Sequence, residues 1–389
     1  MRGPLSGVLV VDLSRALAGP HATMMLGDLG ARVVKVEAPD RGDDTRGWGP
    51  PFAGPDHDPQ STYFLSANRN KESLVLDLKA DSDREILLRL IDRADVLVEN
   101  FRTGVLERLG LGIDLLMKRN PQLVALSITG FGHDGPEGGR PGYDQIAQGE
   151  AGLMSLTGSG PDDPERVGVP IGDLLAGIYG AYGVLAALHE RSVTGEGQVV
   201  RTSLLAALVG VHAFQGTRWT VAGEIGRAQG NHHPSIAPYG LFRCHDGAVQ
   251  IAVGSESLWR RLCDGFAIDP SGLSTNTERV NSRERMIEVV EAAFAGWDAA
   301  PLLARLADLG VPAGRIRGLD EVYTWDQTRS QGLLIDVEHA SLGHLTLPGP
   351  PLRFFDPSGH ESTPSGHTAP PRLDQHGESL RMWLSEEAR

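Results

Sequence analysis

The stretch "GVLVVDLSRALAGPHATMMLGDLGARVVKVE", residues 7–37, decides the fold. Its ends, GVLVVDL (7–13) and RVVKVE (32–37), are valine-rich runs typical of buried strands, and the segment between them reads as a helix that ends at Gly30. The alternation continues with strand-like runs at 73–78, 95–100 and 123–128 and an amphipathic helix at 82–94. Repeated strand–helix–strand units predict an α/β fold with Rossmann-like topology and a mostly parallel sheet.

The pattern changes in the second half of the chain. Two long helices are expected near 173–192 and 202–223, and a polar linker with glycine and proline follows. Beyond it we expect strands at 248–254 and 311–317, helices near 256–266, 283–296 and 299–309, an irregular segment at 269–282, a late β-hairpin and a final helix near 376–387. These patterns predict a large domain (1–224), a smaller α+β domain (225–330) and a C-terminal segment (331–389).

Composition excludes several classes of protein. The chain has 389 residues and a net charge of −14, which disfavours a nucleic acid or an anionic membrane as main partner. Two cysteines, Cys244 and Cys263, are too few for a disulfide framework and lack metal-ligand spacing. The longest apolar run, Leu174–Leu188, is shorter than the roughly 18–20 residues that span a bilayer. We therefore expect a cytoplasmic protein.

Common cofactor motifs are missing. Glu37 ends the second strand, where a ribose-binding acid would lie, but the turn SRALAGPHAT lacks the three glycines of a dinucleotide-binding loop. No P-loop, HExxH or GxSxG sequence occurs, and NHHP (231–234) has no carboxylate at metal-ligand spacing. The sequence predicts neither a metal site nor a permanently bound cofactor.

A glycine-rich segment, DGPEGGRPGYDQ (134–145), precedes the second half of the large domain. Such a loop lets backbone N–H groups approach a ligand closely, and it carries Tyr143 and Asp144. An ordinary surface loop has the same composition, so both interpretations stay open.

Asp173 stands at the start of the apolar helix in VPIGDLLAGIYGAYGVLAALHER (169–191). Its local pattern favours an N-cap, yet a helix start also keeps a carboxylate ionised, and an aspartate with an ordinary pKa of ~3.9 can attack a thioester. Gly177, Gly180 and Gly183 each lower the stability of the helix by about 0.5–1 kcal/mol relative to alanine. Close packing of another helix explains their spacing.

Several blocks of the chain, taken in order, resemble the class III CoA-transferases, which include formyl-CoA transferase and carnitine CoA-transferase. The blocks include PLSGVLVVDLSRALAGP, LGARVVKVEAP, NRNKESLVLDLK, DVLVENFRTGVLERLGLG, GYDQIAQGEAGLMSLTG and PIGDLLAGIYG. The resemblance covers nearly the whole chain. It implies a Rossmann-like CoA-binding domain that is completed by the C-terminal segment, a small domain, and two chains interlocked as a homodimer.

The resemblance also implies an activity. In the family, the aspartate of the "GD" block is the nucleophile, and it matches Asp173. CoA would pass from an acyl-CoA thioester to a carboxylic acid through aspartyl anhydride and aspartyl-CoA intermediates. The matching CoA-binding positions are Leu17, Ala18, Leu76, Lys79, Asn100, Phe101, Arg102 and Arg108, with Tyr143 and Asp144 at the acyl group.

Two departures bear on the substrate. A glutamine that contacts oxalate in formyl-CoA transferases is Leu17 here, and GNHHPSIAPYG replaces their run of glycines. Both changes argue against formate and oxalate as substrates. The apolar Leu17 suggests a larger acyl group, and the resemblance to members that use dicarboxylates implies that His232 or His233 holds a second carboxylate.

Two alternatives remain. α-Methylacyl-CoA racemases share the fold, but their base is a histidine where this chain has Tyr143, and a phenol of pKa ~10 is a poor base at neutral pH. A non-catalytic acyl-CoA-binding protein is the second alternative, and the presence of Asp173 argues against it.

Overall fold

A six-stranded parallel sheet organises the larger part of the chain. The structure is a computed structural model that describes residues 2–386. The sheet lies in a compact unit that comprises the residues up to Leu153, Val167–Gly223 and those from Gln327 onwards. Its strands are β1 (Leu9–Asp12), β2 (Arg32–Glu37), β5 (Lys71–Val75), β6 (Val96–Glu99), β7 (Val124–Thr129) and β8 (Val199–Ser203). Every neighbouring pair is parallel, so the expected α/β fold is confirmed.

The order of the strands locates the functional edge of this sheet. The order is β5-β2-β1-β6-β7-β8, so the chain builds outward from β1 on one side and from β6 on the other. Between β1 and β6 the loops at the carboxyl ends of the strands leave toward opposite faces, and this opens a crevice. The sequence pattern gave no sign of the position of this switch point.

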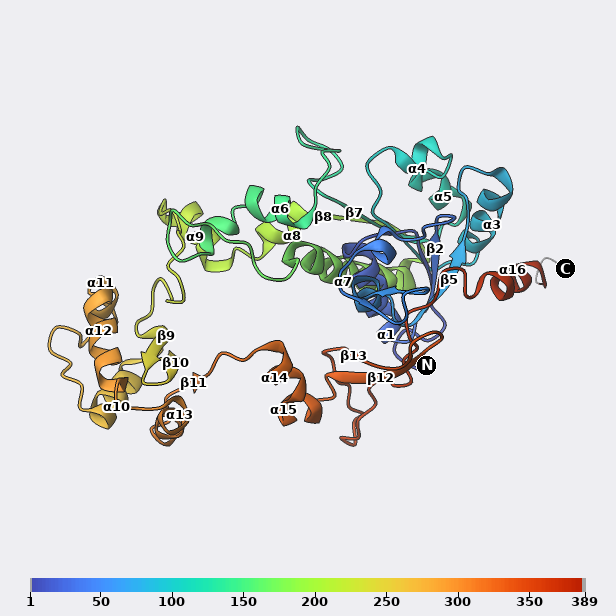
Figure 1. Ribbon diagram of the computed structural model, residues 1–389. Coiled ribbons are helices and arrows are strands. Elements are labelled where there is room, and N and C mark those ends of the chain that lie inside the picture. The colour runs from blue at the N-terminus through green and yellow to red at the C-terminus, as the bar shows by residue number, and fades with distance from the viewer. Residues whose placement is uncertain (1, 387–389) are drawn as a thin grey trace. The chain divides into compact units, whose positions relative to one another are not determined.

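Helices cover both faces of the sheet. On one face, α1 (Ala18–Asp28) and α7 (Ile171–Thr194) lie side by side (Figure 1). The other face is covered by α3 (Asp81–Ile91), α5 (Ile113–Arg119) and α16 (Gly377–Glu386). Adjacent residues of β1 point to opposite faces, because Val10 packs in the first core and Val11 in the second. Burial on both faces explains why strands β1, β2 and β6 are rich in valine.

The glycines of α7 permit close packing, as the sequence predicts. A Cβ at Gly177 would lie 2.7 Å from the carbonyl oxygen of Ala18 in α1. A Cβ at Gly180 would lie 2.8 Å from Leu126 in β7, and one at Gly183 would lie 2.6 Å from Val200 in β8. The row therefore faces both a helix and the sheet, not a helix alone.

Helix α7 also bears on the membrane prediction. By length and composition it is able to cross a membrane, so the expectation that the apolar run is too short is wrong. The helix nevertheless packs against α1, α8, β7 and β8. These contacts bury one side of the helix in the core of the first unit.

Other local predictions are wrong as well. The single helix expected at 202–223 is strand β8 followed by α8 (Leu204–Gly210) and α9 (Ala213–Ala222). The segment expected to be irregular at 269–282 contains α11 (Asn276–Asn281), which begins with a capping box between Thr275 and Glu278. The strand expected at 311–317 shrinks to β11 (Ala313–Gly314).

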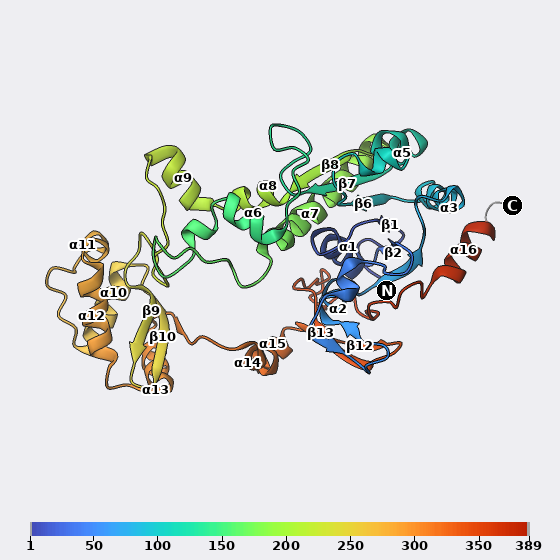
Figure 2. The same cartoon turned by 45° about the horizontal axis from the view of Figure 1, so that its top comes forward.

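The second compact unit comprises Met154–Arg166 and Glu224–Asp326. It contains an antiparallel sheet of β11, β10 (Gly247–Ala252) and β9 (Tyr239–Cys244). Figure 2 shows α10 (Glu256–Phe266), α12 (Arg283–Phe294) and α13 (Ala299–Asp308) around these strands, with a core that includes Trp259, Phe242 and Phe294. The division into domains at 224 and 330 stays a prediction.

The remaining elements are short. The first unit also contains the hairpin of β12 (Leu334–His339) and β13 (Gly343–Pro348), as predicted for the tail. The others are β3 (Phe52–Ala53), β4 (Gln60–Ser61), α2 (Thr62–Ala67), α4 (Val105–Arg108), α6 (Asp144–Glu150), α14 (Leu319–Thr324) and α15 (Asp326–Ser330), with 3-10 turns η1 (Asp44–Gly47) and η2 (Met154–Leu156).

Candidate active site

A cavity of about 350 Å³ opens at the crevice between β1 and β6. Its walls come from several segments of the first unit: the loops after β1 and β6, the glycine-rich loop after β7 and the start of α7, with further residues from η1, α2 and α8. Asp173 lies on its wall. The cavity therefore brings the candidate nucleophile to the carboxyl-terminal edge of the sheet, where open α/β sheets bind their ligands.

Asp173 is not the cap of its helix, as its local pattern suggests. Helix α7 begins at Ile171, and Pro170 stands at the N-cap position without a side-chain hydrogen bond. Asp144, the first residue of α6, takes the capping role. Its Oδ1 accepts hydrogen bonds from the backbone N–H of Gly172 at 2.7 Å and of Asp173 at 3.3 Å. The Asp173 side chain is thereby left available for chemistry.

Gly172 makes this cap possible. A Cβ at this position would lie 3.0 Å from Oδ1 of Asp144 and 3.2 Å from a methyl carbon of Leu208. Gln148, one turn further along α6, donates to the other oxygen of Asp144 at 2.7 Å. Both carboxylate oxygens of Asp144 therefore accept hydrogen bonds, one from Gln148 and one from the first turn of α7.

The Asp173 carboxyl group has an unusual environment. It is partly buried, and among residues 2–386 no side chain or backbone group forms a hydrogen bond or ion pair with it. Burial, followed by the negative charge of Asp144, raises the pKa of Asp173 to about 7. The expectation that Asp173 is ionised with an ordinary pKa is wrong in this structure. A carboxylate of raised basicity is a stronger nucleophile when it does ionise.

The same two neighbours affect Tyr63, which lines this cavity together with Trp48. Burial and the charges of Asp173 and Asp144 raise the pKa of the Tyr63 phenol to about 12. The Trp48 and Tyr63 rings meet edge to face, with centroids 5.0 Å apart. Neither aromatic residue was identified from the sequence, since Trp48 follows the short turn η1 and Tyr63 lies in the short helix α2, where no periodic signal marks them.

Most of the positions implied by the resemblance meet at this edge. Those that line the cavity with Asp173 are Ala18, Asn100, Phe101, Arg102, Tyr143 and Asp144. A second cavity, of about 420 Å³, is lined by Leu76 and Lys79 and also by Phe101, Arg102 and Tyr143. The two cavities therefore share walls.

Two positions lie apart from them. Leu17 precedes α1 and is buried, and Arg108 ends α4 with its side chain exposed. Neither is among the described residues that line the two cavities.

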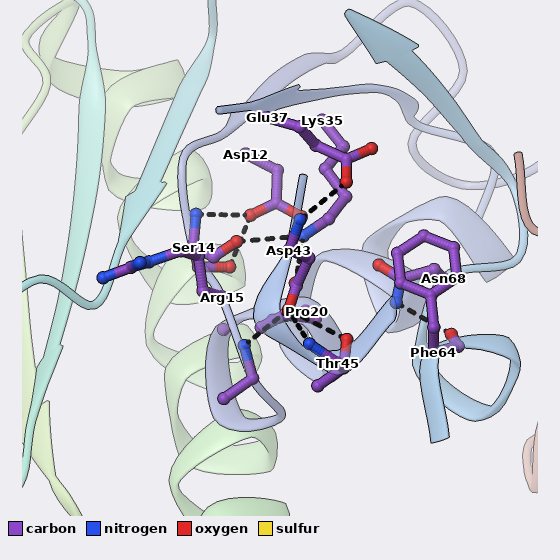
Figure 3. Close-up of polar contacts among 12 residues, drawn as sticks. Asp12, Ser14, Arg15, Pro20, Lys35, Glu37, Asp43, Thr45, Phe64 and Asn68 are labelled. Carbon is purple, nitrogen blue, oxygen red and sulfur yellow. Dashed lines mark hydrogen bonds and ion pairs between the residues drawn. The ribbon is translucent and has the colours of Figure 1, made fainter. Parts of the chain in front are cut away.

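A buried cluster of charges supports the loop after β1 (Figure 3). Lys35 lies 2.8 Å from Asp43, and Lys71 lies 3.1 Å from Asp12, with all four side chains inaccessible to solvent. Burial alone would raise the pKa of Asp12, but the charges of Lys71 and Lys35 hold it at about 2. The sequence carried one signal of this cluster that was missed: Lys35 interrupts a buried valine strand, and a buried lysine needs an ionic partner.

Glu37, the candidate ribose ligand, belongs to the same region but serves the protein itself. It pairs with Arg46 at 2.7 Å and accepts hydrogen bonds from Ser73 and from the backbone of Asp43. The carboxylate is buried and occupied, so it is unsuited to binding a ribose.

The histidines of the linker lie in the second unit. The ring of His232 packs edge to face with Phe242, and that of His233 stacks on Tyr239. Burial lowers the pKa of both imidazoles. In the described residues, no group of three or more His, Cys, Asp or Glu side chains is arranged to hold a metal ion.

Comparison with known proteins agrees with this geometry. Residues 5–377 match the model of CoA-transferase family III. A crystal structure of a CaiB/BaiF family protein from Brucella suis is similar with a TM-score of 0.86 and 37% identity, covering 99% of this chain and 100% of that chain.

Named relatives cover nearly the same length. Succinyl-CoA:glutarate CoA-transferase of Mus musculus is 38% identical over 96% of this chain and 84% of the relative. Succinate–glutarate CoA-transferase of Agrobacterium fabrum is 38% identical over 91% of this chain and 92% of the relative. Acetyl-CoA:oxalate CoA-transferase of Acetobacter aceti is 36% identical over 98% of this chain and 95% of the relative. The chain belongs to CoA-transferase family III and is an enzyme of the CoA-transferase class, as its sequence blocks predict.

Proposed function

We propose that this enzyme moves CoA from an acyl-CoA to a carboxylic acid through covalent intermediates on Asp173. A carboxylate oxygen of Asp173 attacks the thioester carbonyl carbon, the C–S bond breaks, and CoA leaves as a thiolate while a mixed anhydride remains. The thiolate then attacks the aspartyl carbonyl carbon and releases the donor acid, which leaves an aspartyl-CoA thioester.

The second half of the cycle reverses these steps with a new acid. The acceptor carboxylate attacks the aspartyl thioester and releases CoA thiolate, which attacks the acyl carbon of the new anhydride. The products are the new acyl-CoA and the free Asp173 carboxylate. One thioester replaces another, so the exchange needs no nucleotide hydrolysis.

The observation that carries this proposal is the free side chain of Asp173. Its helix is capped by Asp144 instead, and its carboxyl group lies on the wall of a cavity without a hydrogen-bond partner among the described residues. A structural aspartate at a helix start is normally occupied by its own cap. A carboxylate that is oriented but unoccupied fits a nucleophile.

The neighbouring cavity fits the CoA molecule. We place its adenine near Leu76 and Lys79 and its pantetheine along Asn100, Phe101 and Arg102, toward Ala18. Basic side chains suit the phosphates, and the shared walls give the thioester a path to Asp173. Leu17 and Arg108 stay in the proposed CoA site on the resemblance alone. We expect no permanently bound cofactor.

The names of the relatives suggest the chemical class of the acceptor acid. Glutarate, oxalate and mesaconate, which appear in the names of relatives, each carry two carboxyl groups. We propose a dicarboxylic acid as the acceptor. Leu17 lines neither cavity among the described residues, so the argument against oxalate rests on the resemblance alone, and on that ground we propose a longer acid such as glutarate.

We further propose that two chains form the interlocked homodimer of the family, and that the enzyme works in the cytoplasm. Large apolar side chains are exposed along α7, α8 and α9, namely Ile178, Tyr179, Tyr182, Val209, Trp219 and Val221. A surface of this kind is typical of a protein interface.

The proposal is tested by trapping the intermediate. Hydroxylamine added with an acyl-CoA should convert Asp173 to a hydroxamate that mass spectrometry locates on the peptide. Asp173→Asn should bind CoA with unchanged affinity and form no adduct. If the purified protein binds CoA but never forms the adduct, and Asp173→Asn behaves identically, the enzyme does not use this chemistry.

The racemase alternative is separated by a second measurement. Tyr143 is exposed and stands where a racemase has its histidine. Incorporation of deuterium at the α-carbon of a 2-methylacyl-CoA in D2O, without any acceptor acid, would favour the racemase.

A further inference from the structure

We propose that the guanidinium of Arg15 binds the free carboxylate of a dicarboxylic substrate and selects such acids over monocarboxylic ones. The inference rests on the proposed function, because the other carboxylate of the substrate is the one that reacts at Asp173. Arg15 and Asp173 line the same cavity, and Arg15 also lines the neighbouring one. The side chain therefore stands where the two cavities meet.

Among the described residues, the charge of Arg15 meets only weak partners: the carboxylate of Asp44 and the ring of Phe101, whose centroid lies 5.4 Å from the guanidinium carbon. Its one ion pair in the described chain is with Asp44 at 3.4 Å, and the two side chains are 48% and 57% exposed. Ion pairs this exposed contribute about 0–1 kcal/mol. A substrate carboxylate can accept two parallel hydrogen bonds from one edge of the guanidinium. This bidentate contact is stronger than the pair with Asp44, so the substrate can replace Asp44.

The backbone of Arg15, in contrast, is held on both sides. Its N–H donates to Oδ1 of Asn100 at 2.8 Å, and Nδ2 of Asn100 donates to its carbonyl oxygen at 2.7 Å. Lys35 donates to the carbonyl oxygen of Ser14 at 2.9 Å, and Ala16 donates its N–H to Asp43 at 3.2 Å.

These contacts fix an unfavourable backbone. Ala16 adopts a φ of +64°, a conformation that residues with a Cβ rarely take without support. Figure 3 shows the Arg15 side chain extending away from the buried cluster. The backbone is therefore preorganised and only the side chain has to order when a substrate binds, which reduces the entropic cost of binding.

The other cations of the cavity are less suited to this role. Arg140 already pairs with Glu137 at 3.2 Å and Glu150 at 2.6 Å. Arg102 lines both cavities and is placed against the CoA molecule in the proposed function. Among the described residues that line the cavity with Asp173, these two and Arg15 are the basic ones.

The test compares one acid with and without its second charge. With succinyl-CoA as donor, kcat/KM is measured for glutarate and for monomethyl glutarate, which has similar length and a single free carboxylate. Acetyl-CoA as a second donor and succinate and valerate as further acceptors complete the panel. In a double-displacement cycle, kcat/KM of the acceptor reports only the second half-reaction.

We expect Arg15→Gln to lower kcat/KM for glutarate about 10- to 100-fold, the usual loss for a hydrogen bond to a charged group. The value for monomethyl glutarate should change less than about 3-fold on the same grounds. Arg15→Lys should restore part of the loss, because it keeps the charge without the fork. Asp44→Asn, which removes the competing carboxylate, should lower KM for glutarate. Arg329 is an exposed arginine on α15, so Arg329→Gln serves as a control and should leave kcat/KM unchanged for both acids.

Several results overturn the proposal. One is an equal loss for both acids in Arg15→Gln, which would place Arg15 against CoA or in loop structure. A second is an Arg15→Gln variant whose preference for glutarate over monomethyl glutarate equals that of the wild type. A third is a wild-type enzyme that uses only monocarboxylic acceptors. A wild-type enzyme that transfers CoA to no acid at all contradicts the proposed function instead, so the two failures are distinct.

Discussion

The carboxylate of Asp144 accepts a hydrogen bond from the backbone N–H of Gly172 at 2.7 Å, and so caps the helix that carries Asp173. This contact joins two residues that are 28 positions apart. It orients the candidate nucleophile and also places a negative charge beside it, and this charge adds to burial, the larger cause, in raising the pKa of Asp173.

Asp144→Asn should separate these two effects. The amide oxygen of asparagine can still accept the hydrogen bond from Gly172, but the charge is gone, so the pKa of Asp173 should fall below its present value of about 7. The acidic limb of the pH profile of kcat/KM for the acyl-CoA should shift to lower pH. Asp144→Ala removes the cap as well, and it should lower stability by about 1 kcal/mol. A pH profile that does not move in Asp144→Asn would contradict the assignment of that limb to Asp173.

Gly172→Ala tests the geometry of the cap rather than its charge. The new Cβ would lie 3.0 Å from the capping oxygen and 3.2 Å from Leu208, so one of them has to move. We expect kcat to fall by about 10- to 100-fold, since small displacements of reacting groups are costly, with a smaller change in the affinity for CoA. Gly168→Ala is the matched control, because a Cβ there meets nothing within 4 Å. Equal effects of the two substitutions would argue against a role for the Gly172 contact.

Asp173→Asn should stabilise the protein at alkaline pH while it abolishes turnover. The folded-state pKa of Asp173 is raised to about 7 from an ordinary 3.8, so the neutral form is favoured on folding. That contribution is complete below pH 3.8 and is lost as pH rises through about 7. The Tm of Asp173→Asn should therefore exceed that of the wild type by about 2–4 °C at pH 8, and by much less at pH 5. A difference in Tm that is independent of pH would show that the raised pKa is wrong.

The parallel sheet was predictable because strands such as β1, β2 and β6 are buried on both faces and read as valine-rich runs. Strand β8 (Val199–Ser203) was not, since its short run joins directly to the helix-like leucines of α8. The cap of α7 was assigned to Asp173 for the same kind of reason. Local sequence shows a carboxylate at a helix start, but it does not show that Asp144 approaches from another loop.

The site was predictable residue by residue only where the family resemblance supplied a match. Asn100 matched a CoA-binding position, and the structure gives it a further contact, with the backbone of Arg15. Trp48 and Tyr63 reach the cavity from a segment whose path depends on turns and on packing between distant segments. Positions that depend on such long-range contacts follow from the fold, not from periodicity.

The buried pair of Lys35 and Asp43 gives a last prediction, on stability. Lys35→Met removes one partner and leaves the Asp43 charge buried without an opposite charge, so we expect a loss of about 3–5 kcal/mol in the free energy of unfolding. Lys35→Met combined with Asp43→Asn should recover much of that loss, because no uncompensated charge remains. Urea unfolding of the two single variants and the double variant, analysed as a double-mutant cycle, measures the coupling between the side chains. The surface pair Arg119–Asp92, 34% and 41% exposed, is the matched control, and its removal should cost less than about 1 kcal/mol. If the losses at Lys35 and Asp43 simply add, the pair does not act as a unit, and another contact supports the loop that carries Arg15.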